Sequence, residues 1–251
     1  MARRIAIRIL LFAAVALAFT FWPAIKAARP AEATLAQVPV ALDNWQFTYD
    51  MPQADAAGDY LVIVHYPHDS AAAVQQAAEA MNRHAVALTR DGQQVHVTLV
   101  FKKPLSPAEF RRFVQVSGVT PTTSTVRAVQ PDGLRVTMGV PPVWLGNAAG
   151  QRSIGQTYPG QDPLDEETLS RLQSRHPTNV VLGVISTEVV LDSAALSRVQ
   201  NAPEVSAVDL LSEVITRQVQ AQHRGTEASK IHVQGSQLYW FMEDTGIAPR
   251  R

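Results

Sequence analysis

The stretch from Val95 to Val114 is VHVTLVFKKPLSPAEFRRFV, and it predicts a strand that leads directly into a helix. Apolar side chains alternate along its first half, as they do along one buried face of a strand. Ser106-Pro107-Ala108-Glu109 then forms a capping box with proline at the first helical position. Phe110 and Phe113 follow on one side of the predicted helix.

A second stretch has the same order of elements. Val180 to Val199 is VVLGVISTEVVLDSAALSRV, an apolar strand followed by a helix for which Asp192 is a suitable cap. With an offset of 86 residues, Ser106 aligns with Asp192 and Phe110 with Leu196. Two β-α-β halves are what a ferredoxin-like two-layer sandwich with an antiparallel sheet requires. We therefore expect an α+β fold made of one or two such sandwiches.

Two segments also resemble a known family. Ala195–Asp209 is ALSRVQNAPEVSAVD, which is similar to the last helix-strand unit of the propeptide inhibitors of subtilisin-type proteases. Val97–Gly118 is similar to the opening strand and helix of that family. The resemblance implies a ferredoxin-like fold and, for function, inhibition of a protease. A long insert separates the two segments in this chain, and further residues follow the second.

The N-terminus has the pattern of an export signal. Arg3, Arg4 and Arg8 precede Ile9–Ile25, a run without a charged residue. Its length lies within the range of about 17 to 25 residues that a membrane-spanning helix needs. We expect a signal anchor or signal peptide over 1–26 and favour the anchor. The basic residues before the run place the N-terminus inside and the bulk of the chain in an extracytoplasmic location.

Charge and cysteine content limit the classes of function. The chain has 22 basic and 22 acidic residues, but five of the basic ones lie in or beside the N-terminal apolar run. The remaining 17 face 22 acidic residues, so the globular part is mildly acidic. This balance argues against a nucleic-acid-binding protein. The absence of cysteine excludes disulfides and cysteine-ligated metal sites.

The pattern of elements predicts five segments after the anchor. Leu61 and Ile63 belong to an apolar strand, Tyr60–Tyr66, that we expect to be buried on both faces. Ser70 or Asp69 can cap a helix that runs to about His84, and a hairpin should follow with Val86 and Leu88 on its first strand. The predicted segments are a stalk over 27–44, a first α+β unit over 45–140, a Gly/Pro-rich loop over 141–161, a second α+β unit over 162–222 and a tail over 223–251.

The predicted core consists of apolar residues on the inner faces of these elements. Its members are Leu61, Ile63, Val97, Leu99, Phe110, Phe113, Leu182, Val184, Leu196, Val199, Val205 and Val208.

No motif for catalysis stands out. His65-x-x-His68-Asp69 offers two imidazoles and a carboxylate to a metal, but Asp69 can equally cap a helix. Acidic residues at 165–167 could form a carboxylate pair, or could complement the dipole of a helix that begins there. No G-x-S-x-G or phosphate-binding loop is present. We therefore predict no catalytic residue, no metal and no cofactor, and keep a hydrolase or metal-dependent enzyme that uses His65 and His68 as an alternative.

Binding is the function that the sequence favours. Trp144 and Tyr158 lie in the Gly/Pro-rich loop, and large rings on loops are frequent at binding hot spots. Tyr239, Trp240 and Phe241 form an apolar group in the tail, which either packs on the core or contacts a partner. We expect a membrane-anchored module that binds an unknown protein partner or supports envelope assembly, with a regulator of an extracytoplasmic protease as the alternative.

Overall fold

The structure is a computed structural model. It describes residues 37–42, 45–50, 54–55, 57–65, 70–89, 94–142, 162–235 and 238–249. The chain divides into two units, 1–36 and 37–251, and all described residues lie in the second. None of the helices among them is both long and apolar enough to span a bilayer. The predicted anchor, 1–26, lies outside the described residues.

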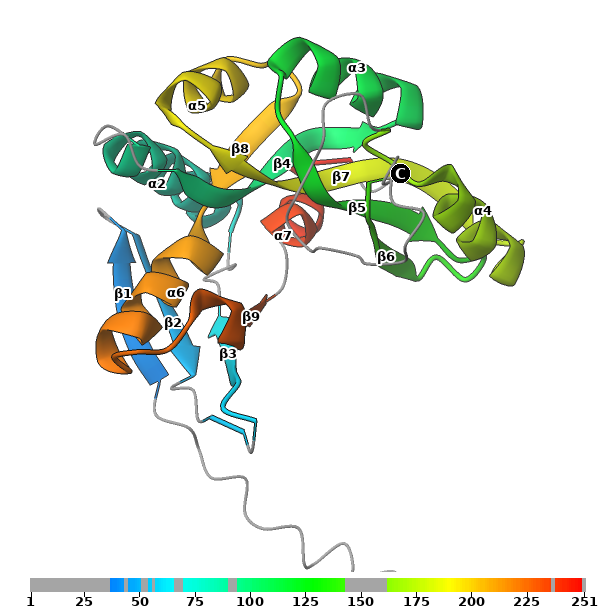
Figure 1. Cartoon of the computed structure of the whole chain (residues 1–251). Helices are drawn as coiled ribbons and strands as arrows, with labels where there is room; N and C mark the ends of the chain where they lie inside the picture. The colour runs from blue at the N-terminus through cyan, green and yellow to red at the C-terminus, as the bar shows by residue number, and fades with distance from the viewer. Residues whose placement is uncertain are drawn as a thin grey trace, which may run out of the picture. The chain divides into compact units, whose positions relative to one another are not determined.

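The described strands form two sheets, and the fold is α+β with mainly antiparallel pairing (Figure 1). The four-stranded sheet has the order β1-β2-β3-β9, in which only β3 and β9 run parallel. The five-stranded sheet has the order β6-β5-β7-β4-β8, with antiparallel neighbours throughout. The strands are β1 (Gln37–Leu42), β2 (Trp45–Asp50), β3 (Tyr60–His65), β4 (Val95–Leu105), β5 (Pro121–Val129), β6 (Arg135–Val140), β7 (Val180–Leu191), β8 (Val205–Asp209) and β9 (Ile231–Gly235).

Six α-helices and one short 3-10 helix complete the described part of the chain. Helices α3 and α5 lie on one face of the five-stranded sheet, and α7 lies on the other (Figure 1). The helices are α2 (Ala71–Thr89), α3 (Pro107–Ser117), α4 (Glu166–Arg175), α5 (Ser193–Gln200), α6 (Leu211–Gln222), the 3-10 helix Ala228–Lys230 and α7 (Leu238–Asp244).

The five-stranded sheet separates two hydrophobic cores. On β4, Leu99 and Phe101 pack with α3 and α5, whereas Val100 between them packs with α2, α6, α7 and the four-stranded sheet. On β7, the neighbours Val184 and Ile185 divide in the same way. A sheet buried on both faces has apolar residues at successive positions, which is why β4 and β7 are the most continuously apolar strands of this sheet.

The local signals for the helices are confirmed. The Ser106 hydroxyl accepts from the Glu109 amide, and the Glu109 carboxylate accepts from the Ser106 amide at 2.8 Å, which completes the capping box of α3. Asp192 caps α5 by accepting from the Ala195 amide at 2.8 Å. Ser106 and Asp192 therefore hold the same place in β4-α3 and β7-α5, as the offset of 86 residues implies.

The segment boundaries in the structure differ from the predicted ones. Residues 37–42 of the predicted stalk form β1, which pairs along its whole length with β2. The predicted α+β units, 45–140 and 162–222, do not form separate sheets, because both contribute strands to the five-stranded sheet. The predicted tail, 223–251, supplies β9 and α7 to the fold. β1 forms a hairpin with its neighbour β2, whereas the five-stranded sheet and β9 depend on strands distant in the sequence, which a local pattern does not contain.

Two further expectations were wrong. No hairpin begins at Val86, because α2 continues to Thr89, and Val86 and Leu88 pack against the core on the side of α3 and α5. In β3 the outward and inward residues are reversed relative to the predicted core. Val62 and Val64 are buried, whereas Leu61 and Ile63 are 50% and 41% exposed.

Most of the predicted core is confirmed. Leu182 is half-buried, and the remaining predicted core residues outside β3 are buried. These are Val97, Leu99, Phe110, Phe113, Val184, Leu196, Val199, Val205 and Val208.

Phe110 provides a test of the core between the five-stranded sheet and α3. Its ring is fully buried and meets Phe101 edge-on, with centroids 6.0 Å apart. We expect Phe110→Ala to lower the free energy of unfolding by about 3 to 5 kcal/mol in urea titration. Val116 on the same helix is 79% exposed, so Val116→Ala should change it by less than about 0.5 kcal/mol. Equal effects of the two variants would contradict the packing of α3.

Candidate functional site

Of the predicted cluster His65-x-x-His68-Asp69, the structure describes only His65. His65 ends β3, and its Nε2 lies 3.0 Å from Oδ1 of Asp50 on β2. His68 and Asp69 lie outside the described residues. Ser70 caps α2, since its hydroxyl accepts from the Ala73 amide at 3.2 Å. The described residues contain no group of three histidine or carboxylate side chains that could hold a metal ion, so His65 is shown here only as the partner of Asp50.

The predicted loop over 141–161 is described only at its two ends, 141–142 and 162 onward. Trp144 and Tyr158 lie outside the described residues. Before the loop, Val140 is buried, and the Pro141 carbonyl accepts from the Asp165 amide at 3.2 Å. After the loop, Leu164 is fully buried in the core that contains α3 and α5. The two ends of the loop are thus held together at the edge of the five-stranded sheet that β6 forms.

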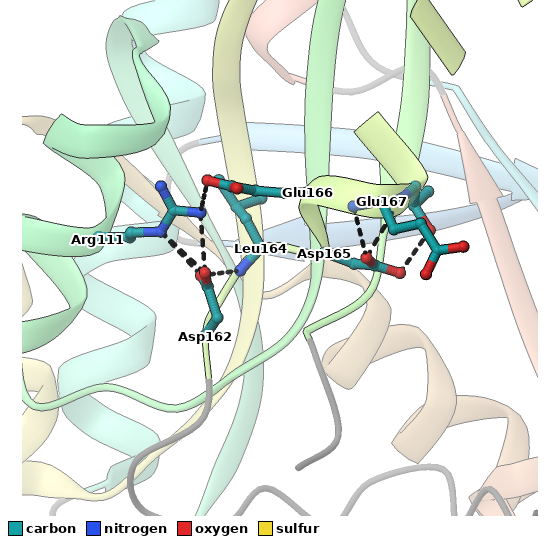
Figure 2. A network of polar contacts seen from close by, with 7 residues as sticks. Arg111, Asp162, Leu164, Asp165, Glu166 and Glu167 are labelled. Carbon is teal, nitrogen blue, oxygen red and sulfur yellow. Dashed lines mark hydrogen bonds and ion pairs between the residues drawn. The ribbon is translucent and has the colours of Figure 1, made fainter. Parts of the chain in front are cut away.

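A charged clamp joins the far end of the loop to α3 (Figure 2). The Arg111 guanidinium donates to both oxygens of Asp162, with Nε 2.9 Å from Oδ1 and Nη2 2.9 Å from Oδ2. Nη2 also donates to Oε1 of Glu166 at 2.6 Å. The hydrogen bond to Asp162 is the main cause of a raised pKa of Arg111. A two-pronged contact of this kind has a defined geometry and is stronger than an ordinary surface ion pair.

The three acidic residues at the start of α4 have different partners. Asp165 caps the helix, because its Oδ1 accepts from the amides of Glu167 and Thr168 at 3.0 and 3.2 Å. A further hydrogen bond from the Thr168 hydroxyl, at 2.6 Å, is the largest cause of a lowered pKa of Asp165. Glu166 belongs to the clamp (Figure 2), and the exposed Glu167 forms an ion pair with Arg171, with Oε1 3.8 Å from Nε. Asp165 and Glu166 thus fix the start of α4, and Glu166 and Glu167 lie in its first turn, where acidic residues complement the helix dipole.

The aromatic group near the C-terminus packs against the core. Tyr239 is fully buried, and Trp240 and Phe241 are half-buried on α7. The Trp240 ring lies beside the Arg127 guanidinium, whose carbon is 4.8 Å from the ring centroid. Of the two expectations for the aromatic group, Tyr239 therefore meets the first, packing on the core. Leu238, Tyr239 and Met242 of α7 all belong to that core.

A buried ion pair beside these rings was not found by sequence reasoning. Arg127 of β5 and Glu243 of α7 are both fully buried. Arg127 Nε donates to Oε1 of Glu243 at 3.1 Å, and Nη2 pairs with Oε2. Arg135 of β6 donates to the same Oε2 at 2.9 Å and to Asp244 at 2.6 Å. The one local signal for this network is an arginine placed between Val126 and Ala128 in an apolar strand.

The ion pair is surrounded by polar atoms that the described residues do not satisfy. Arg127 Nη1, the Tyr239 hydroxyl and Trp240 Nε1 are buried without a hydrogen-bond partner among these residues. Burial, followed by the negative charge of Glu243, raises the pKa of the Tyr239 phenol. Loss of either charge of the Arg127–Glu243 pair would be costly, since the remaining charge would stay buried and uncompensated.

Comparison with known proteins finds no relative of this chain. No protein-family model, no curated protein and no solved structure matches the chain.

Glu243→Gln tests the energetic importance of the buried pair. The variant keeps the shape of the side chain but leaves the Arg127 charge without its counter-ion, so we expect about 3 to 5 kcal/mol of destabilisation in urea titration. Glu166→Gln is the matched control, because Glu166 also pairs with an arginine but is exposed. Its effect should stay below about 1 kcal/mol. Similar effects of the two substitutions would contradict a buried ion pair at α7.

Proposed function

We propose that the chain is a non-enzymatic module, anchored in a membrane through residues 1–26, that binds a protein partner with the 141–161 loop on the extracytoplasmic side. The basic residues and the uncharged run at the N-terminus support the anchor. The contacts that hold the two ends of the loop support the binding site. These contacts, Arg111 with Asp162 and Pro141 with Asp165, are the main observation behind the proposal.

The base of the loop has the features of a binding loop on a rigid scaffold. The Pro141–Asp165 hydrogen bond closes it, Leu164 anchors it in the core, and Arg111 holds Asp162 by two hydrogen bonds. Loops positioned in this way carry a large share of the binding residues in proteins. Fixing the ends also lowers the entropy that the loop loses when it binds. Trp144 and Tyr158 supply rings of the kind that dominate binding energy.

We further propose that the five-stranded sheet is an expanded ferredoxin-like sandwich. Its elements β4-α3-β5-β7-α5-β8 follow the β-α-β-β-α-β succession, with α3 and α5 on one face. β6 and α4 lie between β5 and β7 in the chain, and β6 extends the sheet at its edge. The four-stranded sheet, α2, α6 and α7 cover the second face, which is open in a two-layer sandwich.

Two tryptophans of the chain allow a direct test of the binding loop. In pull-downs from detergent-solubilised membranes, Trp144→Ala should recover several-fold less partner while its melting temperature stays within about 1 °C of the parent. Trp240→Ala should do the reverse, because its ring packs against buried Arg127. That variant should melt several degrees lower and retain partner recovery per folded molecule. Full recovery with Trp144→Ala would refute the loop as the site.

A second candidate function is regulation of an extracytoplasmic protease. The observation in its favour is that the two segments resembling propeptide inhibitors, Val97–Gly118 and Ala195–Asp209, lie together in the fold. β4 from the first pairs with β8 from the second, for example Leu99 with Val208. If this function holds, the purified chain should inhibit a subtilisin-type protease in proportion to its concentration and remain uncleaved. Digestion of the chain without inhibition would exclude this candidate for that protease class.

A further inference from the structure

The outer face of the four-stranded sheet carries exposed apolar side chains on an inner strand. Residues alternate along β3, so that Val62 and Val64 enter the core while Leu61 and Ile63 face outward. β3 lies between β2 and β9. Leu61 and Ile63 lie two residues apart on this strand, and neighbouring apolar side chains that stay exposed can form a contact with something outside the domain.

Polar residues surround this apolar pair. In the pairing with β9, Leu61 lies opposite His232 and Ile63 lies opposite Gln234, and both β9 residues are exposed. On the side of β2, His65 contacts Asp50. The described neighbours of Leu61 and Ile63 on this face are thus polar, and an apolar centre with a polar rim is the usual composition of a docking surface.

The chain connects this same sheet to the predicted anchor. β1 begins at Gln37, which pairs with Asp50, and Asp50 contacts His65 at the end of β3. β1 and β3 are two strand spacings apart, roughly 10 Å. Residues 26–36, between the apolar run and β1, can span at most roughly 40 Å when fully extended. If residues 1–26 are anchored in the bilayer, residues 26–36 therefore limit how far Leu61 and Ile63 can move from it.

We infer that the outer face of the four-stranded sheet, centred on Leu61 and Ile63, docks on the lipid surface. The inference rests on the membrane anchor of the proposed function. Two apolar side chains alone would bind a bilayer weakly, but a short tether makes the contact intramolecular and raises its effective concentration. Figure 1 shows β6 and α4, which flank the binding loop, at the side of the fold away from this sheet. Docking would leave the base of the loop accessible from the aqueous phase.

A second copy of the chain fits this face less well. Stable protein interfaces bury roughly 1,200 to 2,000 Å² in total, whereas Leu61 and Ile63 are the only exposed large apolar side chains among the described residues of this sheet. The tether to the bilayer also favours lipid, since it places the face near the membrane irrespective of protein concentration.

The absence of cysteine allows a site-specific test in the full-length chain. Gln234→Cys places a bimane label beside Ile63 and leaves both apolar side chains in place. Val116→Cys on α3, another highly exposed position, is the matched control. In phosphatidylcholine vesicles that contain nitroxide-bearing lipid, we expect the label at 234 to be quenched at least three-fold more than the label at 116. Adding Leu61→Ser and Ile63→Ser should remove that difference.

The outcomes separate the inference from the proposed function. Equal lipid quenching at 234 and 116, in chain that stays in the membrane pellet after alkaline extraction, would overturn docking and leave the anchor intact. Release of the chain by alkaline extraction would refute the anchor and the docking together. Disulfide-linked dimers of the unlabelled Gln234→Cys variant, without lipid quenching at 234, would assign the face to a second copy and overturn the inference.

Discussion

Burial of both faces of the five-stranded sheet is the constraint on which the rest of the structure depends. β4 contributes Leu99 and Phe101 to one core and Val100 to the other. Neither core can form without this sheet, and neither face can be left to water. The helices of the β-α-β halves cover one face, so the second face needs α2, α6, α7 and the four-stranded sheet. This requirement explains why segments from both ends of 37–251 converge on it.

Close approach of the strands within this sheet depends on Gly183. Its φ of +137° is unfavourable for other residues, and an added Cβ would overlap the Leu105 carbonyl. The pairing of β4 with β7 shifts register between Val100 and Leu105. β4 can therefore bend into α3 at the point where the capping box begins, and α3 in turn carries Arg111 to Asp162.

The ion pair between Arg127 and Glu243 gives α7 a defined position on the second face. Apolar residues such as Leu238 and Met242 could pack in several registers, whereas a buried carboxylate must meet its guanidinium. The pair also links α7 to β6 through Arg135. The edge strand before the loop is thus held from one side by α7, and the segment after the loop is held from the other side by Arg111.

Short-range physics accounts for what the sequence by itself determined. The capping box at Ser106, the cap at Asp192, the helices that follow them and the inward faces of β4 and α3 all depend on residues within one or two turns of each other. Tertiary structure decided the rest. Tyr60–Tyr66 is apolar almost throughout, so only packing against the core that α2, α6 and α7 form selects Val62 over Leu61. The continuation of α2 past Val86, the entry of 223–251 into the fold, and the pairing of Arg127 with Glu243 depend on partners distant in the chain. No periodicity records such partners, because it registers which side of an element is apolar and not what will cover it.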